Sequence, residues 1–531
     1  MSEAAERVME RVQRADRNGA LELATQAFAA GDRHPLIVML TAETIEATDP
    51  GRAIQLLRHV TRETPDEPEP WRRLGILLAR TGQHEEARTA LEEADDIWPD
   101  QPLIVEPLGN VCLTLADLDA ADAHFERLET LLPGKAAPLA ARAAVATRRG
   151  DRSAARELGE RALAAEPGNG TAALALARLA LDAGEPAEAE ARATALLERA
   201  GAESDAAVGI LGLRAGARDA AGAYDAAFAD YLARNELVRA RTGPLLARQG
   251  AERRVDQARR LRHAIAQQPP LALHAVPPEP NAPAAHIFVL GFPRSGTTLL
   301  EKALAGHSRV RTLPEIDCLG RVAGGLLEKA GAERLAALTP AEIAGLRRAY
   351  LGLVEVEVGA VAGQVLVDKL PLHSVALPLI ARLFPEATLV LSLRDPRDVV
   401  LSCLRRRFQM NAAMFELLRP ADAINYYEAV MELVETCRTR LPVELHEVRH
   451  EALVADLEGE VRRLLALAGL EWEPAIAEFA GRAAARTRTP SDVQLTRGLN
   501  AEGVGHWRRY AEPLAPWLPR LNRWVKRWGY A

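Results

Sequence analysis

Hydrophobic positions in the first half of the chain recur with the spacing of amphipathic helices, and short breaks of Gly, Asp or Pro separate them. The same pattern returns every 34 residues. Three residue types keep this phase, and they are Leu40, Leu74 and Leu108; Ala53, Ala87, Ala121, Ala155 and Ala189; and Pro65, Pro99, Pro133 and Pro167. A fixed period of this length indicates an array of helical hairpins, in which each unit buries its apolar face by stacking on the next.

One unit carries a recognisable signature. Its residues at the signature positions are Trp71, Leu74, Gly75, Leu78, Ala87, Leu91, Ala94 and Pro99. This unit resembles the tetratricopeptide repeat, which implies an α-solenoid over residues 1–265 with five or six units between about 15 and 245. A generic helical array is the other interpretation. Solenoids of this type present concave surfaces to polypeptides, so the resemblance implies a peptide or protein partner.

A Pro-rich segment separates the two halves of the chain. Its prolines are Pro269, Pro270, Pro277, Pro278, Pro280 and Pro283. Proline-rich sequences break helices and form semi-rigid spacers, so we assign residues 266–285 to a linker and residues 286–531 to a second domain.

The second half opens with the pattern of a phosphate-binding loop. Residues 286–291 (HIFVLG) form an apolar run typical of a buried strand, FPRSGTT follows at 292–298, and a helical pattern begins thereafter. Backbone N–H groups and a helix N-terminus converge in such an arrangement and bind anions. Thr297 occupies the lysine position of nucleoside-triphosphate loops, which favours a ligand with a single 5′-phosphate.

A second junction between a strand and a helix carries two arginines and a hydroxyl. Residues 388–393 (TLVLSL) predict a buried strand, Arg394 follows it, and Ser402 and Arg406 lie on the predicted helix beyond. These three side chains can converge on one dianion. Taken alone, Arg394 could equally form an ordinary salt bridge with a neighbouring aspartate.

Together the two motifs resemble the donor site of sulfotransferases, particularly the tyrosylprotein sulfotransferases and repeat-bearing bacterial relatives. The resemblance implies a P-loop-like α/β domain with a central parallel sheet, hence an α + α/β chain, and the donor 3′-phosphoadenosine 5′-phosphosulfate (PAPS) with product 3′,5′-ADP. It assigns two sets of donor-binding residues. These are Pro293, Arg294, Ser295, Gly296, Thr297 and Thr298 for the 5′-phosphosulfate, and Arg394, Ser402 and Arg406 for the 3′-phosphate.

The resemblance also implies the catalytic groups. Lys369 follows the strand-like run VLVD, and Ser491 opens a segment near the C-terminus; with Arg294, both would stabilise negative charge at the reacting sulfuryl group. Glu315 is the expected general base, although a glutamate favoured by a helix N-terminus is the other interpretation. Trp507 is expected in the loop that covers the donor. No metal is expected, because the transferred group carries a single charge.

One motif points to different chemistry. Residues 446–450 (HEVRH) satisfy the zinc-protease pattern H-E-x-x-H, which requires a helix that places both histidines on one face. The segment follows Pro442 closely and its pattern favours a strand, where the histidines would not share that geometry. We therefore discount a zinc site here.

The amino-acid composition limits which binding partners and which cellular compartment we expect. A formal net charge of -7 gives no general basic field, so we expect no nucleic acid. Apolar runs fall short of the roughly 20 residues that span a bilayer, and the N-terminus lacks the apolar stretch of a secretory signal. Four cysteines without a C-x-x-C pair fit a reducing compartment, so we expect the cytoplasm.

The sequence thus predicts a PAPS-dependent sulfotransferase that modifies an acceptor hydroxyl, preferably a tyrosine of a peptide or protein docked by the repeats. A glycan, a lipid or a small hydroxylated metabolite is an alternative acceptor. A non-catalytic scaffold that binds nucleotide is the alternative function. The oligomeric state is open, with a homodimer as one option.

Overall fold

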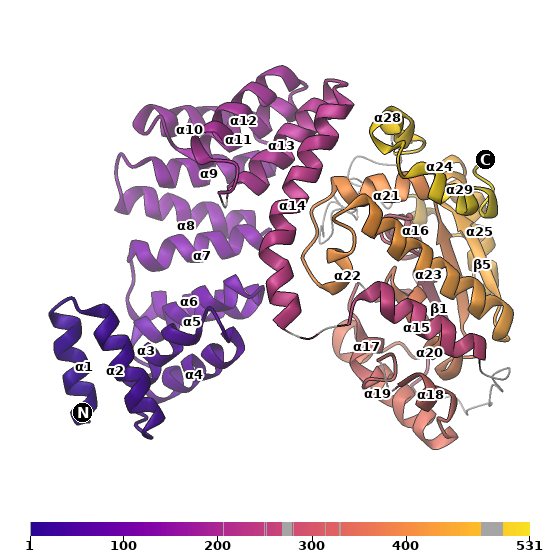
Figure 1. Ribbon diagram of the computed structural model, residues 1–531, viewed down its shortest axis with the longest axis horizontal. Helices are drawn as coiled ribbons and strands as arrows, with labels where there is room; N and C mark the ends of the chain where they lie inside the picture. Colours follow the sequence, from indigo (N-terminus) through magenta and orange to yellow (C-terminus); the bar gives the residue numbers. More distant parts are fainter. Residues whose placement is uncertain are drawn as a thin grey trace. The chain divides into compact units, whose positions relative to one another are not determined.

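The computed structural model describes residues 2–204, 206–248, 250, 252–267, 279, 281–313, 315–328, 331–478 and 503–531. The chain divides into two units, Met1–Ala202 and Glu203–Ala531. Figure 1 shows helices alone in the first unit, and a sheet covered by helices in the second.

The first unit is built from helical hairpins. Its helices are α1 (Glu3–Gln13), α2 (Arg17–Ala29), α3 (Pro35–Ile45), α4 (Pro50–Glu63), α5 (Pro68–Arg80), α6 (His84–Ile97), α7 (Pro102–Thr114), α8 (Leu118–Leu131), α9 (Ala136–Arg149), α10 (Arg152–Ala165), α11 (Gly170–Asp182) and α12 (Pro186–Ala200). Gly75 explains the close crossing of α5 and α6, because a Cβ there would lie 2.6 Å from Leu91 Cγ. Gly82, at φ +84°, forms the turn between these two helices. The helical array expected from the 34-residue period is confirmed.

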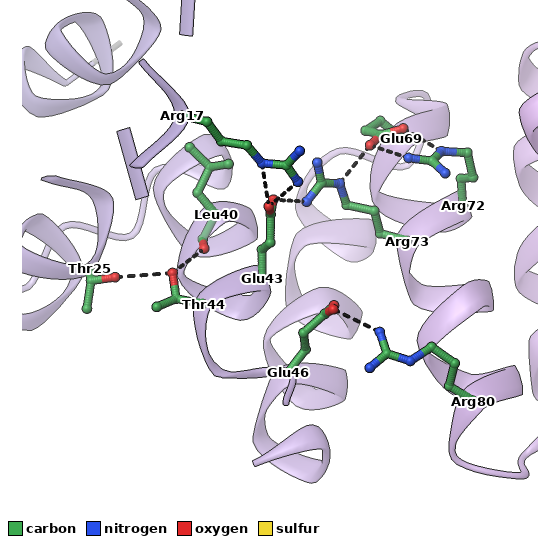
Figure 2. Close-up of polar contacts among 10 residues, drawn as sticks. All are labelled: Arg17, Thr25, Leu40, Glu43, Thr44, Glu46, Glu69, Arg72, Arg73 and Arg80. Atoms are coloured by element: carbon green, nitrogen blue, oxygen red, sulfur yellow. Dashed lines mark hydrogen bonds and ion pairs between the residues drawn. The ribbon is translucent and has the colours of Figure 1, made fainter. Parts of the chain in front are cut away.

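Arginine–glutamate pairs tie neighbouring hairpins together (Figure 2). Glu43 of α3 accepts hydrogen bonds from Arg17 of α2 and Arg73 of α5, and Arg73 also donates to Glu69 at 2.6 Å. Burial raises the pKa of Glu43, but the bonds from Arg73 and Arg17 outweigh it, so that its pKa lies below the ordinary value. Arg80 pairs with Glu46 at 2.8 Å in the same way. These side chains therefore add directional contacts to the apolar stacking of the repeats.

The second unit contains a five-stranded parallel sheet with the order β2-β3-β1-β4-β5. The strands are β1 (Ala285–Leu290), β2 (Val310–Leu313), β3 (Val365–Lys369), β4 (Thr388–Leu393) and β5 (Leu445–Arg449). Because all strands run the same way, the segments that follow β1, β3 and β4 meet at one edge of the sheet. The expected central parallel sheet is confirmed.

Helices cover both faces of this sheet. They are α13 (Ala207–Ala220), α14 (Tyr224–Arg248), α15 (Arg254–Gln267), α16 (Thr297–Leu304), α17 (Cys318–Ala323), α18 (Gly331–Ala336), α19 (Pro340–Val358), α20 (His373–Leu383), α21 (Pro396–Arg405), α22 (Ala412–Phe415), α23 (Pro420–Arg440), α24 (His450–Ala455), α25 (Leu457–Leu467), α28 (Ala511–Leu514) and α29 (Leu518–Arg527), with 3-10 helices η1 (Pro474–Glu478) and η2 (His506–Tyr510). Successive residues of β1 point to opposite faces of the sheet. Ile287 and Val289 pack with α16 and α25, whereas Phe288 and Leu290 pack with α20 and α23. The unit is therefore a three-layer α/β structure.

The division between the units falls earlier than the boundary expected at residue 265. Helices α13, α14 and α15 belong to the second unit, and Phe228, Tyr231 and Leu261 are buried in its core. The physical reason is that α14 has 25 residues, against 11 to 15 in α1 to α12, and places aromatic side chains against the α/β layers. Most of the predicted linker, residues 268–278 and 280, lies outside the described residues.

The described helices include none that is both long and apolar enough to cross a membrane. Trp524 of the C-terminal helix α29 and Trp528 directly after it are buried in the core of the second unit. These tryptophans therefore contribute to packing.

Candidate active site

A cavity of about 820 Å³ lies where the loops after β1, β3 and β4 meet. Nine of the residues predicted for donor binding or catalysis line it, namely Pro293, Arg294, Gly296, Thr297, Thr298, Glu315, Arg394, Ser402 and Arg406. Ser295 and Lys369 are buried beside the cavity wall. Ser491 lies outside the described residues, so its expected role stays a prediction.

The loop between β1 and α16 has the backbone of an anion cradle. Arg294 and Gly296 both adopt positive φ angles, +72° and +96°, which turn the chain sharply into the helix. The loop is fixed from outside, because Ser392 donates a hydrogen bond to Ser295 O at 2.8 Å. Thr297 and Thr298, the first residues of α16, line the cavity. The N–H groups at the start of a helix attract anions, so this loop can bind a phosphate.

Gly296 offers a direct test of the cradle. An added Cβ would lie 2.6 Å from His450 Nδ1, and its φ of +96° strains any L side chain. We expect Gly296→Ala to distort the loop and to weaken 3′,5′-ADP binding by about tenfold or more. Titration calorimetry measures this loss. Gly345→Ala in α19, where a Cβ meets no atom within 4 Å, is the matched control and should bind the nucleotide as the wild type does. Undiminished binding by Gly296→Ala would show that the nucleotide does not use this loop.

Three arginines converge on the same part of the cavity. Arg294 Nε donates to Ser402 Oγ at 3.0 Å, and Arg394 Nη1 donates to Arg294 O at 3.2 Å. Burial and, to a smaller extent, the charges of Arg406 and Arg394 together lower the pKa of Arg294 to about 9. Burial likewise lowers the pKa of Arg406. A ligand that carries two or more negative charges would relieve this crowding of like charges.

Arg394 does not form the ordinary salt bridge considered from the sequence. Asp395 pairs with Arg397 at 2.7 Å, and Asp398 accepts the backbone N–H groups of Gly505 and Trp507, each at 2.7 Å. Arg394 instead donates to the backbone oxygens of Arg294 and Gly503. Its Nε is buried and lacks a partner among the described residues. The arginine is therefore free to add a ligand bond at that atom.

Lys369 at the end of β3 sits between two carboxylates. Its Nζ lies 2.5 Å from Glu315 Oε1 and 3.3 Å from Glu301 Oε2, and only 1% of its side chain is exposed. Glu315 is 34% exposed and lines the cavity. The buried lysine is therefore linked to the cavity by its ion pair with Glu315. The structure thus brings together the two groups predicted as general base and catalytic lysine, although 54 residues separate them in the chain.

A buried network fixes the backbone next to Lys369. Asp368 accepts hydrogen bonds from Tyr350 Oη at 2.7 Å and from His373 Nε2 at 3.0 Å. Burial raises the pKa of Asp368, but the bonded His373 and Tyr350 lower it below its ordinary value, and Asp368 in turn raises the pKa of His373. This network was not predicted from the sequence. The only signal was the position of Asp368 directly before the lysine.

Trp507 lies in a segment that borders the cavity, although its own side chain is not part of the lining. Gly503 and His506 from this segment do line the cavity. The segment is held by Asp398 through backbone N–H groups and by the guanidinium of Arg397, which lies 4.0 Å from the centre of the Trp507 ring. The predicted donor-covering residue is therefore placed at the rim, and its contact with donor stays a prediction.

His450 is a cavity residue that sequence reasoning considered only for zinc. Leu445–Arg449 forms β5 and His450 begins α24, so His446 and His450 do not share one helical face. Burial and, to a smaller extent, the charges of Arg394 and Arg294 together lower the pKa of His450 to about 3. Its buried Nδ1 finds no partner in the described part of the chain. The neutral imidazole is thus available as a further ligand group.

Comparison with known protein families agrees with the family resemblance expected for each half of the chain. Residues 286–474 match the profile described as the sulfotransferase family, and residues 44–106 and 146–211 match that of the tetratricopeptide repeat. The C-terminal half of the chain carries a sulfotransferase domain. The tetratricopeptide repeats of the N-terminal half indicate interaction with other proteins.

Individual relatives match less than half of the chain, and at low sequence identity. An uncharacterized protein of Aquifex aeolicus is 27% identical over 254 residues, which make up 45% of this chain and 33% of that protein. Protein-tyrosine sulfotransferase 1 of Danio rerio is 28% identical over 256 residues, 44% of this chain and 71% of that one. A tetratricopeptide repeat protein of Parabacteroides merdae aligns over 44% of this chain and 92% of its own, at 16% identity and a TM-score of 0.38. The chain thus spans only a third of the first of these relatives.

Proposed function

We propose that this protein transfers a sulfuryl group from PAPS to an acceptor hydroxyl, with a tyrosine of a peptide or protein as the preferred acceptor. The observation that carries the proposal is the convergence of Arg294, Arg394, Ser402 and Arg406 on one cavity beside a phosphate-binding loop. A cavity with this charge and this loop suits a ligand with two separate phosphate groups.

The residues present fit the donor. The loop from Pro293 to Thr298 would bind the 5′-phosphosulfate through its N–H groups and through Arg294. Ser402 on α21 and Arg406 directly after α21, with Arg394, would bind the 3′-phosphate. Arg394 Nε and His450 Nδ1 are buried and have no hydrogen-bond partner within the described ranges of the chain, which supports this proposal because buried polar atoms in folded proteins normally have a partner.

Glu315 and Lys369 would carry out the transfer as a coupled pair. Glu315 accepts the proton of the acceptor hydroxyl, whose oxygen forms a bond to sulfur as the bond from sulfur to the 5′-phosphate oxygen breaks. The electron pair stays on the departing phosphate, and 3′,5′-ADP leaves. Protonation removes the negative charge that Glu315 holds beside Lys369, so the ammonium becomes available to the departing oxygen. Arg294 stabilises the same developing charge, and Ser491 is proposed to do so as well.

The remaining wall of the cavity supports an aromatic acceptor. Its apolar and aromatic side chains are Met414 on α22, Phe408 in the loop before α22, Tyr426 on α23, and Leu327 and Leu372 from two other loops; Arg254, Gln257 and Glu328 lie among them. The apolar and aromatic part of this wall favours a phenol over a strongly hydrated sugar. We propose that the tetratricopeptide repeats bring a polypeptide acceptor to the enzyme, and that the enzyme works in the cytoplasm, where its four buried, unpaired cysteines stay reduced.

Transfer of radiolabelled sulfur from PAPS tests the function. The full-length protein would be incubated with labelled PAPS and with paired peptides that differ by a single Tyr→Phe replacement. We expect label on the tyrosine peptide and none on the phenylalanine peptide. Label on both peptides would remove the tyrosine assignment. Tight binding of 3′,5′-ADP without transfer to any protein, glycan or lipid fraction of a lysate would favour the scaffold alternative.

A further inference from the structure

The C-terminal end of α21 is held by two side chains from α14. The last carbonyl oxygens of a helix find no N–H donor within that helix, so they need donors from elsewhere. Arg234 Nη2 donates to Leu404 O at 2.6 Å and Arg234 Nη1 donates to Arg405 O at 3.1 Å. Asn235 Nδ2 donates to the same Leu404 O at 3.1 Å. Two neighbouring residues of α14 therefore cap the helix that carries Ser402.

Both capping side chains are buried deeply. Arg234 is 5% exposed and Asn235 is 1% exposed, and Arg234 also donates to Asn235 Oδ1 at 2.8 Å. Burial and, to a smaller extent, the charges of Arg407 and Arg406 together lower the pKa of Arg234 to about 10. A buried arginine beside another arginine is costly, and its charge here lies against the negative end of the α21 dipole. The contacts of Arg234 thus fix the position of the C-terminal end of α21.

The preceding helix α13 secures the same region from a second side. Asp219 accepts hydrogen bonds from Arg405 at the end of α21 and from Tyr510 of η2, and it lies 3.4 Å from His506 Nε2. Burial raises the pKa of Asp219, but His506, Arg405 and Tyr510 lower it below its ordinary value. The carboxylate therefore joins α21 to the C-terminal segment that borders the cavity.

We propose that the α13–α14 hairpin, residues 207–248, is a positioning element of the donor site. Arg234 and Asn235 hold the end of α21 in the place where Ser402 and Arg406 can bind the 3′-phosphate, and they do so without touching the donor themselves. This inference rests on the proposed function of those two residues. Helices that the sequence pattern assigned to the repeat array would thus take an indirect part in donor recognition.

The test compares two nucleotides that differ only in the 3′-phosphate. Affinities of the full-length protein for 3′,5′-ADP and 5′-AMP are measured by titration calorimetry. We expect Arg234→Met to weaken 3′,5′-ADP binding by about tenfold and to leave 5′-AMP binding unchanged. The variant displaces only the side chains that bind the 3′-phosphate, and 5′-AMP has no such group. Arg234→Lys, which keeps the charge, should recover part of the loss. Glu236→Gln, on the same helix in a surface pair with Arg419, is the matched control and should bind both nucleotides normally.

Each outcome decides the inference. An equal loss for both nucleotides would overturn it, because such a loss reflects general damage to the fold. An unchanged ratio in Arg234→Met would overturn it too. If Arg234→Met does not fold, Asn235→Ala removes one donor to Leu404 O and serves the same comparison. A wild-type protein that binds the two nucleotides equally would instead overturn the proposed donor site, and the inference with it.

Discussion

Glu315→Gln is expected to lower kcat by about 10²- to 10⁴-fold and to leave 3′,5′-ADP binding close to that of the wild type. Glutamine has nearly the same shape as glutamate but cannot accept the proton of the acceptor hydroxyl. Because Glu315 lines the cavity and contacts Lys369, its neutral replacement also removes the pairing that couples the two groups. The kcat is measured by transfer of labelled sulfur at saturating donor.

Glu328→Gln is the matched control for the general base. Glu328 lines the same cavity but makes no ion pair with Lys369 among the described residues, so its amide variant should keep the wild-type kcat. A Glu315→Gln variant that retains full transfer would exclude Glu315 as the base. Proton acceptance would then have to come from another group or from water.

Lys369→Met is expected to lower kcat by about 10²- to 10³-fold, the usual effect of removing one donor to a developing negative charge. Methionine fills a similar volume without the ammonium. The same change leaves Glu301 and Glu315 without their shared cation, so the free energy of unfolding should fall by about 3–5 kcal/mol. Urea denaturation measures the second effect separately from the first.

Two further variants separate the catalytic from the structural loss. The double variant Glu315→Gln, Lys369→Met should regain part of the stability, because fewer unpaired charges remain, while its kcat stays low. Lys302→Met, which removes the neighbouring lysine 3.7 Å from Glu301, should keep the wild-type kcat. If Lys369→Met transfers sulfur at the wild-type rate, Lys369 serves only to hold the fold.

Local pattern predicted the parts of the site that follow a strand directly. The apolar runs before Gly291 and Arg394 predicted β1 and β4, and the glycine and hydroxyl residues after them predicted an anion-binding loop, since strand ends and helix starts are local properties. The 34-residue period predicted the hairpins for the same reason. These elements needed no knowledge of tertiary contacts.

The partners of the site residues could not be predicted, because they come from distant parts of the chain. The strand order places β3 beside β2 and thereby brings Lys369 to Glu315. The caps of α21 come from Arg234, 170 residues before Leu404. Helical periodicity alone also cannot distinguish a last repeat from a helix that packs on the α/β layers, which is why the expected boundary at 265 differs from the division at Ala202.

A crystal structure with 3′,5′-ADP tests the central claim most directly. We expect the 5′-phosphate against the N-terminus of α16 and the loop at Arg294, and the 3′-phosphate within hydrogen-bond distance of Ser402 and Arg406. A nucleotide bound outside this cavity, or one whose 3′-phosphate contacts neither Ser402 nor Arg406, would contradict the account.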